Sequence, residues 1–301
     1  MGEKVLMKGN EAIGEAAIRS GCRHFFGYPI TPQTELSAYM AKKMPKINGV
    51  FLQAESEVSA INMVYGAAAA GMRTMTSSSS PGISLKAEGI SYLAAGDLPC
   101  VIVNIVRGGP GLGGIQPAQS DYFQAVKGGG HGDYHLIVLA PNSVQELAHL
   151  TAEAFNISDE YRIPTMILGD GTLGQMMEPV DLDAIPEPIY ADKPWAARGT
   201  DNKRKKNVVE TLYLEASELE KKVLEREEKY NVVKENLQRY EAHDIDDADI
   251  IISSYGITSR VVETAVKSLR EEGIKVGVIR PITLWPFPEK AFEGLDDKKF
   301  F

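Results

Sequence analysis

The chain has 301 residues, a length that suggests about two domains, each large enough to bury a hydrophobic core. Hydrophobic residues make up 44% of the chain and charged residues 24%, which excludes a disordered protein, and no run approaches the roughly 20 apolar residues of a membrane span. The net charge of −9 argues against a nucleic-acid surface that neutralises phosphates.

The first residues enter a strand-like segment without a charged region followed by an apolar core, so we expect no signal peptide and a cytoplasmic location. The two cysteines, Cys22 and Cys100, lie far apart in apolar surroundings. They form no Cys-X-X-Cys pair for zinc or an iron–sulfur cluster, so we expect two buried thiols. Any redox centre would lie on another chain.

Up to about residue 190, apolar strand-like runs alternate with amphipathic, alanine-rich stretches. The runs cover 24–28, 49–53, 73–76, 100–106, 135–139 and 165–168, and the helix-like stretches lie near 10–20, 31–43, 57–70, 85–95 and 143–157. This alternation predicts an α/β domain over residues 1–190, with a parallel sheet covered by helices on both faces.

Residues 191–245 are predicted to be a linker followed by a charged helical segment. Between residues 200 and 243 there is no Gly or Pro, and apolar residues recur every three or four positions, with Arg226 as the one break. A single helix of this length would exceed the width of either domain, which favours a reversal near Asn231. The helix would serve either as a connector lying across its own domains or in assembly with other subunits.

After residue 245 the βαβ pattern returns, with a strand at 250–255, a helix near 259–272 and a strand at 275–279. Phe300 and Phe301 follow a charged pair and predict the entry to another buried strand. Two clear strands make a small sheet, so we expect the second domain, residues 246–301, to be incomplete in this sequence.

The segment Tyr28-Pro29-Ile30-Thr31-Pro32 follows a predicted strand. Its two prolines restrict the backbone, and Pro32 favours an extended Thr31, whose hydroxyl is then held near a helix start. Ligands bind at such places in open α/β sheets. From these residues alone, a rigid turn with Thr31 as the helix cap is favoured over a ligand site.

Four motifs, in their order and spacing, resemble the alpha subunit of the 2-oxoacid:ferredoxin oxidoreductases. They are residues 28–32 (YPITP), 53–57 (QAESE), 76–82 (TSSSSPG) and 106–110 (VRGGP). The resemblance implies an enzyme that oxidatively decarboxylates a 2-oxoacid, passes electrons to ferredoxin and releases the acyl group as a coenzyme A thioester. It also implies a thiamine-diphosphate-binding fold, in which a pyrimidine-binding domain precedes the start of a transketolase C-terminal-like α/β domain.

Glu57 matches the family's catalytic carboxylate. Without the resemblance it would be a glutamate in the first turn of a helix, stabilised by the helix dipole by about 0.3–1 kcal/mol. In the family, a carboxylate bonded to N1′ of the cofactor's aminopyrimidine favours the imino form, which then removes the C2 proton of the thiazolium. The nearby Glu55 is expected to be structural. The small residues that follow Glu57 would allow close packing against a partner chain.

The resemblance also assigns roles to Thr31 and Arg107. Thr31 would hydrogen-bond the substrate carboxylate, and Arg107 would bind the same substrate or coenzyme A, since a guanidinium pairs with carboxylate or phosphate through two bonds. A surface arginine beside a glycine-rich loop is the alternative for Arg107. That loop, residues 108–114, lacks the Lys-Ser/Thr of a phosphate cradle and is interpreted as a mobile loop at the substrate entrance. Together with Glu57, the residues expected to line the cofactor site are Tyr28, Pro29, Ile30, Ser79 and Ser80.

Gly169-Asp170-Gly171 imitates the start of the magnesium–diphosphate motif of thiamine enzymes. The second ligand of that motif is an asparagine about thirty residues on, and here Asn202 stands in a basic segment past the linker. Magnesium needs ligands preset in octahedral geometry, so we expect no metal ligand on this chain. His131 and His135 show no metal spacing either. The resemblance implies a beta subunit that supplies the diphosphate and magnesium half of the site, and a small ferredoxin-like subunit that carries iron–sulfur clusters.

The helical segment, at 211–215 and 227–230, is most similar to the branched-chain (2-oxoisovalerate) members of the family. The sequence places no second basic residue near Thr31 that could recognise a distal carboxylate. This favours 2-oxoisovalerate as the substrate, with 2-oxoglutarate as the second choice. Two other classes stay open, a non-catalytic assembly subunit and a self-contained transketolase-type enzyme, which would need its own metal motif. We therefore predict a subunit of a ferredoxin-dependent 2-oxoacid oxidoreductase, active only within a complex, with no nucleic-acid or membrane partner.

Overall fold

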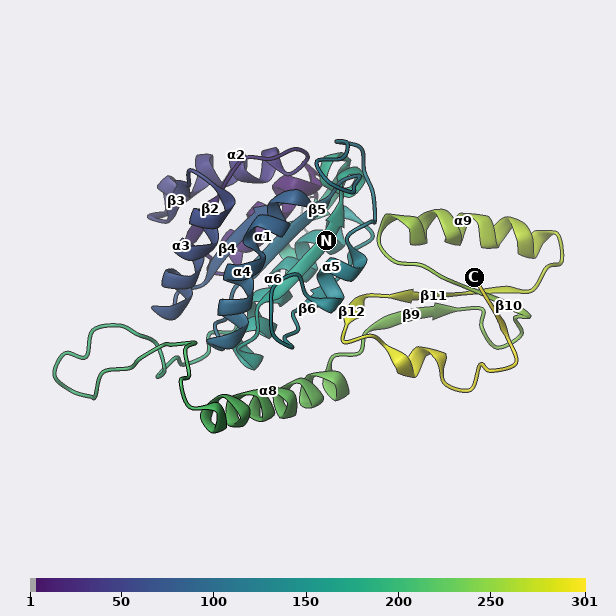
Figure 1. The fold of residues 1–301 in the computed structure, drawn as a ribbon. Helices are drawn as coiled ribbons and strands as arrows, with labels where there is room; N and C mark the ends of the chain where they lie inside the picture. The colour runs from purple at the N-terminus through teal and green to yellow at the C-terminus, as the bar shows by residue number, and fades with distance from the viewer. Residues whose placement is uncertain (1–3) are drawn as a thin grey trace.

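The computed structural model describes residues 4–301, in which a large α/β unit and a smaller one are joined by a long helix (Figure 1). The sheet of the large unit has seven strands in the order β12-β6-β7-β5-β4-β2-β3, and all are parallel except β12, which pairs antiparallel with β6. The strands are β2 (His24–Gly27), β3 (Val50–Gln53), β4 (Thr74–Ser78), β5 (Val101–Val106), β6 (Ile137–Leu139), β7 (Thr165–Asp170) and β12 (Thr283–Trp285). The predicted parallel α/β architecture is confirmed.

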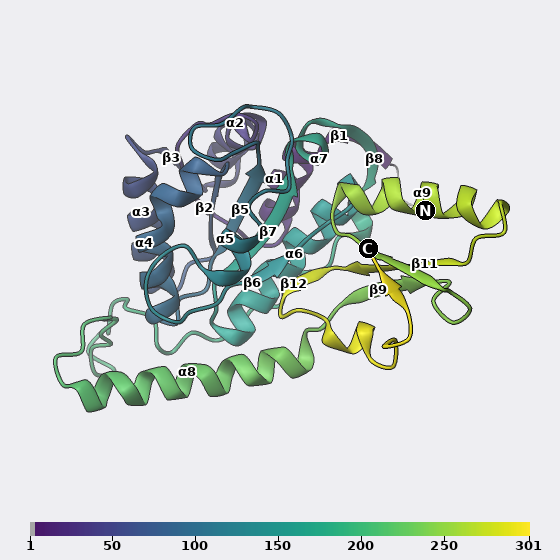
Figure 2. The same ribbon diagram turned by 45° about the vertical axis from the view of Figure 1, so that its right-hand side comes forward.

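Helices cover both faces of this sheet (Figure 2). Helix α1 packs against α2 and α6, while α3 packs against α4. A two-stranded antiparallel ribbon of β1 (Lys4–Lys8) and β8 (Met177–Asp181) lies beside the main sheet. The helices are α1 (Gly9–Arg19), α2 (Thr34–Lys43), α3 (Glu57–Ala69), α4 (Pro81–Ala95), α5 (Tyr122–Lys127), α6 (Val144–Tyr161) and α7 (Gly171–Gln175).

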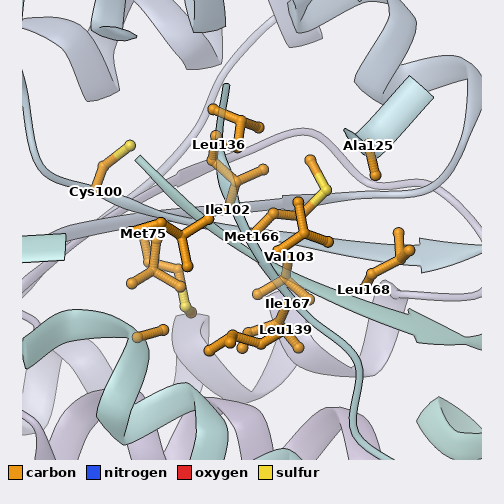
Figure 3. Close-up of a cluster of buried hydrophobic side chains, with 14 of the residues drawn as sticks. Met75, Cys100, Ile102, Val103, Ala125, Leu136, Leu139, Met166, Ile167 and Leu168 are labelled. Atoms are coloured by element: carbon orange, nitrogen blue, oxygen red, sulfur yellow. The ribbon is translucent and has the colours of Figure 1, made fainter. Parts of the chain in front are cut away.

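The core of the large unit lies on the central strands β4, β5, β6 and β7 (Figure 3). Every residue of β5 and β7 is buried, as expected for parallel strands with helices on both sides, which read as continuous apolar runs. Cys22 and Cys100 are free, buried thiols, as predicted. Burial raises the pKa of Cys22 to about 12 and raises the pKa of Cys100 as well.

Helix α8 (Ala216–Asn236) is shorter than the predicted helical stretch. Its 21 residues span roughly 31 Å and run through Asn231 without turning back, so the expected reversal is wrong. Residues 205–214 have no regular structure. The carboxyl-terminal half packs on the large unit through Tyr230, Val233 and Leu237, whereas Leu219, Val223 and Leu224 are exposed. Arg226, the one polar residue in the apolar spacing, also faces the large unit, where its guanidinium donates to Ala95 O at 3.1 Å. This half of the helix is a connector.

The smaller unit has a four-stranded sheet in the order β13-β10-β11-β9, with α9 (Ile257–Glu271) packed on β11. Its strands are β9 (Tyr240–His243), β10 (Ile250–Ser253), β11 (Val276–Pro281) and β13 (Lys299–Phe300). The strand expected at the chain's end pairs with β10. Its burial was wrongly predicted, because the side chains of Phe300 and Phe301 are 44% and 76% exposed.

The chain passes between the two units more than once. β9 precedes residue 246 and joins the smaller sheet, and β12 then returns to complete the large sheet. The division into residues 1–190, 191–245 and 246–301 stays a prediction. No helix within residues 4–301 combines the length and apolar character that a membrane crossing requires.

Ion pairs fix the smaller unit against α6. The buried guanidinium of Arg280 donates from both Nη atoms to the two Glu146 oxygens, each at 2.8 Å, and from Nε to Glu241 at 2.9 Å. Glu178, on β8, accepts a hydrogen bond from Val144 N at 2.8 Å and one from Arg260 Nη1 at 2.7 Å. These bonds place α9 and β11 beside the carboxyl ends of the large sheet's central strands.

Candidate functional site

Four neighbouring strands, β5, β4, β2 and β3, end at one edge of the large sheet. Each is followed by residues singled out from the sequence. Arg107 follows β5, Ser79 and Ser80 follow β4, the segment 28–31 follows β2, and Glu57 comes shortly after β3. Because parallel strands share the same direction, their carboxyl ends bring these residues to one edge, which is where open α/β sheets bind ligands.

Glu57 is the first residue of α3, and Ser56 caps this helix by accepting the Ser59 N–H at 3.2 Å. The Glu57 side chain is only 6% exposed and faces the start of α4. A Cβ built on Gly82 would lie 2.9 Å from Glu57 Oε1, so the absence of a side chain at this position makes room for the carboxylate. No donor within residues 4–301 forms a hydrogen bond to that carboxylate. A buried carboxylate without an internal donor is suited to accept one from a bound molecule.

The turn between β4 and α4 is held in an unusual conformation. Ser80 has φ +32°, a region in which a residue other than glycine is strained by about 1–3 kcal/mol. Its backbone N–H donates to Asn104 Oδ1 at 3.0 Å, and its hydroxyl accepts the Arg107 N–H at 3.0 Å. In the described part of the chain, the buried hydroxyls of Ser78 and Ser79 have no hydrogen-bond partner. Strain and unpaired polar atoms are concentrated at this turn, beside Glu57.

Arg107 is 6% exposed, so the alternative of a surface arginine is wrong. Its guanidinium donates to Thr31 O at 3.0 Å and to Leu112 O at 3.1 Å, and its buried Nε has no partner among residues 4–301. The glycine-rich loop is closed by hydrogen bonds from Gly108 N to Gln116 O and from Gly114 N to Gly108 O, both at 2.9 Å. Arg107 therefore links this loop to the turn that contains Thr31. The predicted mobility of the loop stays a prediction.

Thr31 is exposed and does not cap a helix, so that part of the prediction is wrong. Helix α2 begins at Thr34, and Gln33 occupies its N-cap position. The buried side chain of Gln33 donates to Tyr28 O at 3.2 Å and accepts the Ser77 hydroxyl at 2.6 Å. Tyr28 and Ile30 are half-buried and Pro29 is exposed. Gln33 thus ties the proline-containing turn to the end of β4.

Three buried polar residues of this edge were not found from the sequence. They are Gln33, Asn104 and Lys86, all fully buried. Asn104 interrupts the apolar run of β5, and this interruption was a signal that could have been used. Its side chain accepts the Ser80 N–H and donates to Asp121 Oδ2 at 2.9 Å, so it fixes the turn that follows β4.

Two clefts open on either side of the glycine-rich loop. One, of about 560 Å³, is lined by the start of α4, the loop and Asp121. The other, of about 670 Å³, lies between the turn with Thr31, the end of the loop and α7. Ile115 and Met176 supply apolar surface in the second cleft, and Glu35 is the only charged residue of its lining. Both volumes are in the range of small-molecule sites.

Asp170, the residue of the apparent magnesium motif, caps α7. Its Oδ1 accepts the N–H groups of Thr172 and Leu173 at 2.8 and 3.1 Å, and burial raises its pKa. His131 packs edge-on to Tyr92, and His135 stacks on Trp285 with ring centroids 4.6 Å apart. Among residues 4–301, no group of three or more His, Cys, Asp or Glu side chains is placed to hold a metal ion.

Known proteins are similar to this chain in sequence and in fold. A family model described as pyruvate flavodoxin/ferredoxin oxidoreductase, thiamine diphosphate-binding, matches residues 15–256, and a model of pyruvate:ferredoxin oxidoreductase core domain II matches residues 248–300. The chain is 51% identical to ketoisovalerate oxidoreductase subunit VorB of Methanothermobacter marburgensis over 290 residues, covering 96% of this chain and 82% of the relative. It is 38% identical to 2-oxoglutarate synthase subunit KorA of Methanothermobacter thermautotrophicus over 332 residues, covering 96% and 84%.

Solved structures agree with these matches. The 2-oxoglutarate:ferredoxin oxidoreductase of Magnetococcus marinus, solved with 2-oxoglutarate, coenzyme A and succinyl-CoA bound, superposes with a TM-score of 0.87 at 31% identity. The match covers 97% of this chain and 56% of that one. A split-gene transketolase, at a TM-score of 0.53 and 14% identity, shares the fold. The chain belongs to the thiamine-diphosphate-binding 2-oxoacid:ferredoxin oxidoreductase family and is an alpha-type subunit, most like its branched-chain members.

Proposed function

We propose that this subunit binds the aminopyrimidine half of thiamine diphosphate at the sheet edge and activates the cofactor through Glu57, in a complex that oxidises 2-oxoisovalerate. The burial of Glu57 without an internal hydrogen-bond donor is the observation that carries the proposal. Bound thiamine diphosphate supplies the nucleophilic carbon that attacks the carbonyl of the 2-oxoacid.

The residues of the edge fit this cofactor. The carboxylate of Glu57 offers an acceptor for N1′ of the pyrimidine, and the turn at Ser79 and Ser80 borders the same place. Tyr28, Pro29 and Ile30 would form the other wall, held by Gln33. The chain's part is to hold a proton between Glu57 and the pyrimidine and to keep water away from the buried carboxylate.

Thr31 and Arg107 are proposed to bind the carboxylate of the substrate. The Arg107 guanidinium donates to two backbone carbonyls, at Thr31 and Leu112. A substrate carboxylate would be a stronger, charge-assisted acceptor than either of them. Binding would then require the guanidinium to exchange at least one carbonyl for the substrate, which ties substrate recognition to the position of the glycine-rich loop.

The second cleft supports a branched aliphatic substrate over 2-oxoglutarate. Ile115 and Met176 provide apolar contact, and no lysine or arginine belongs to its lining. The one charged lining residue, Glu35, is already paired with Lys8 at 3.2 Å, so the lining offers no cation to a second carboxylate. A buried charge left without a partner costs about 1–3 kcal/mol or more. We therefore expect kcat/KM to be roughly ten- to a hundredfold higher for 2-oxoisovalerate than for 2-oxoglutarate.

We also propose that partner chains complete the enzyme. Asp170 is engaged as a helix cap and both cysteines are buried thiols, which supports placing magnesium and the diphosphate half-site on a beta subunit and the iron–sulfur clusters on a small ferredoxin-like subunit. Ferredoxin would accept the electrons, and coenzyme A would accept the acyl group.

The test is Glu57→Gln in the reconstituted complex. The neutral amide keeps the size of the side chain, so the subunit composition should not change, but decarboxylation should fall by a factor of about 10² to 10⁴. Glu55→Gln is the matched control and should retain activity. If the Glu57→Gln complex turned over normally, the enzymatic role would be rejected and the alternative of an assembly subunit would stand.

A further inference from the structure

A fully buried lysine lies beneath the candidate site. Lys86 is on α4, and its Nζ donates to Thr76 Oγ1 at 2.7 Å and to Ser77 O at 2.9 Å, both on β4. An ammonium group carries three donors, and lysine is almost never fully buried unless it is paired. Thr76 and Ser77 offer only uncharged oxygens, so hydrogen bonding to β4 does not by itself balance the charge.

The carboxylate of Glu57 lies close to the same part of β4 and α4. Gly82 and Lys86 are four residues apart and share one face of α4. The position of a Cβ on Gly82 is 2.9 Å from Glu57 Oε1 and 2.0 Å from the hydroxyl of Ser78, the neighbour of Ser77. Helical side chains lean toward the amino terminus of their helix, which directs Lys86 toward Gly82 and therefore toward the carboxylate.

The electrostatic environment agrees with this placement. Burial lowers the pKa of Lys86 to about 7, and the negative charge of Glu57 acts in the opposite direction and raises it. Glu57 is the charged group whose field acts on Lys86, since its hydrogen-bond partners on β4, Thr76 and Ser77, are neutral. The two groups are thus coupled across the α3–α4 contact.

We propose that Lys86 is a positioning residue, whose buried ammonium group acts on the nearby Glu57 carboxylate and keeps it oriented toward the pyrimidine site. A positive charge attracts a carboxylate more strongly where water is excluded, so without Lys86 the carboxylate would lose an interaction that holds its orientation. The inference rests on the proposed role of Glu57, but it concerns a different side chain, which is fully buried.

The test uses the whole complex with Lys86→Met, Glu57→Gln and the double variant. The first readout is the Kd of thiamine diphosphate for the cofactor-free complex, measured by quenching of tryptophan fluorescence. We expect Lys86→Met to weaken binding about tenfold, and the double variant to bind no more weakly than Glu57→Gln alone. Effects that multiply in the double variant would overturn the proposal, since Lys86 would then act independently of Glu57.

The second readout is the pH profile of kcat/KM. Lys86→Met should change the shape of the profile, because it removes a charge that acts on Glu57, while a purely structural role would lower activity equally at all pH values and overturn the proposal. Lys193→Met is the control, because Lys193 is also buried and pairs with Asp159 at 2.6 Å. It should leave both the Kd and the profile unchanged.

Two variants distinguish a failure of the Lys86 proposal from a failure of the proposed role of Glu57. If the Lys86→Met complex fails to assemble, Lys86→Gln keeps a donor toward β4 without the charge and should show the same two changes. A wild-type profile in Lys86→Gln would overturn the proposal. Full turnover and cofactor binding in Glu57→Gln would instead reject the proposed function itself, whatever Lys86 does.

Discussion

Gly82 faces Glu57, and replacing it with alanine should damage activity more than folding. The added Cβ would lie 2.0 Å from Ser78 Oγ and 2.9 Å from Glu57 Oε1. Both atoms end flexible side chains, so the backbone can stay in place while these side chains move. The Glu57 oxygen must retreat by roughly 0.5 Å to reach ordinary van der Waals distance.

Two opposing effects set the change in stability of Gly82→Ala. Overpacking costs about 1–3 kcal/mol, while alanine in place of glycine favours a helix by about 0.5–1 kcal/mol. We expect the free energy of unfolding to fall by about 0–2.5 kcal/mol, measured by urea denaturation of the chain. Turnover of the complex should fall about tenfold or more, because a displacement of 1 Å at a catalytic group can cost roughly a hundredfold.

Gly66→Ala, on the exposed side of α3, is the matched control for Gly82→Ala. A Cβ on Gly66 would meet nothing within 4 Å, so the isolated chain should become about 0.5–1 kcal/mol more stable. Wild-type turnover by a well-folded Gly82→Ala complex would refute the reasoning, since it would show that the position of Glu57 against α4 does not matter for catalysis.

Three further predictions concern the fold. Cys22 and Cys100 should resist thiol reagents in the native protein and react at ordinary rates in denaturant, because burial raises the pKa of both; rapid native labelling followed by mass spectrometry would contradict their placement. Arg280→Met should destabilise the chain by roughly 3 kcal/mol by leaving Glu146 unpaired, and a loss below about 1 kcal/mol in guanidinium denaturation would speak against that pair. Burial alone would raise the pKa of Glu178, but the hydrogen bonds and the ion pair of its carboxylate lower it overall. Glu178 therefore stabilises the fold fully above the unfolded pKa of about 4.3, and this stabilisation is lost as pH falls through the lower folded pKa. Glu178→Gln should be less stable than wild type in urea at pH 7 and equal to it near the acid limit, whereas a pH-independent difference would refute this assignment.

The parallel sheet could be predicted from the sequence because its signals are local. Buried parallel strands read as continuous apolar runs, and the residues at their carboxyl ends must share one edge. The roles predicted for Glu57, Ser80, Thr31 and Arg107 came from the resemblance to the family, since the residues alone favoured a helix-start glutamate and a rigid turn. The return of β12 to the large sheet could not be predicted, since the pairing of Thr283 with Leu139, 144 residues apart, leaves no local pattern.

The partners of buried polar side chains were the other features that could not be predicted. The sequence marks Arg107 as a candidate anion receptor but does not show that its guanidinium is engaged by two backbone carbonyls. Lys86 resembles a solvent-facing helix residue until the packing of α4 on β4 is known. The helix around Arg226 was predicted too long, because an apolar spacing of three to four residues continues beyond the helix into β9, where strand pairing with β11 decides the structure.

The most direct test of the account is the rate at which the C2 proton of thiamine diphosphate exchanges with deuterium when the cofactor is bound to the complex. After rapid acid quenching, proton NMR gives this rate without requiring substrate turnover. Glu57→Gln should slow the exchange by about 10² to 10⁴ relative to wild type, with the complex intact and the cofactor bound. Exchange at the wild-type rate in Glu57→Gln would contradict the central claim that Glu57 activates the cofactor.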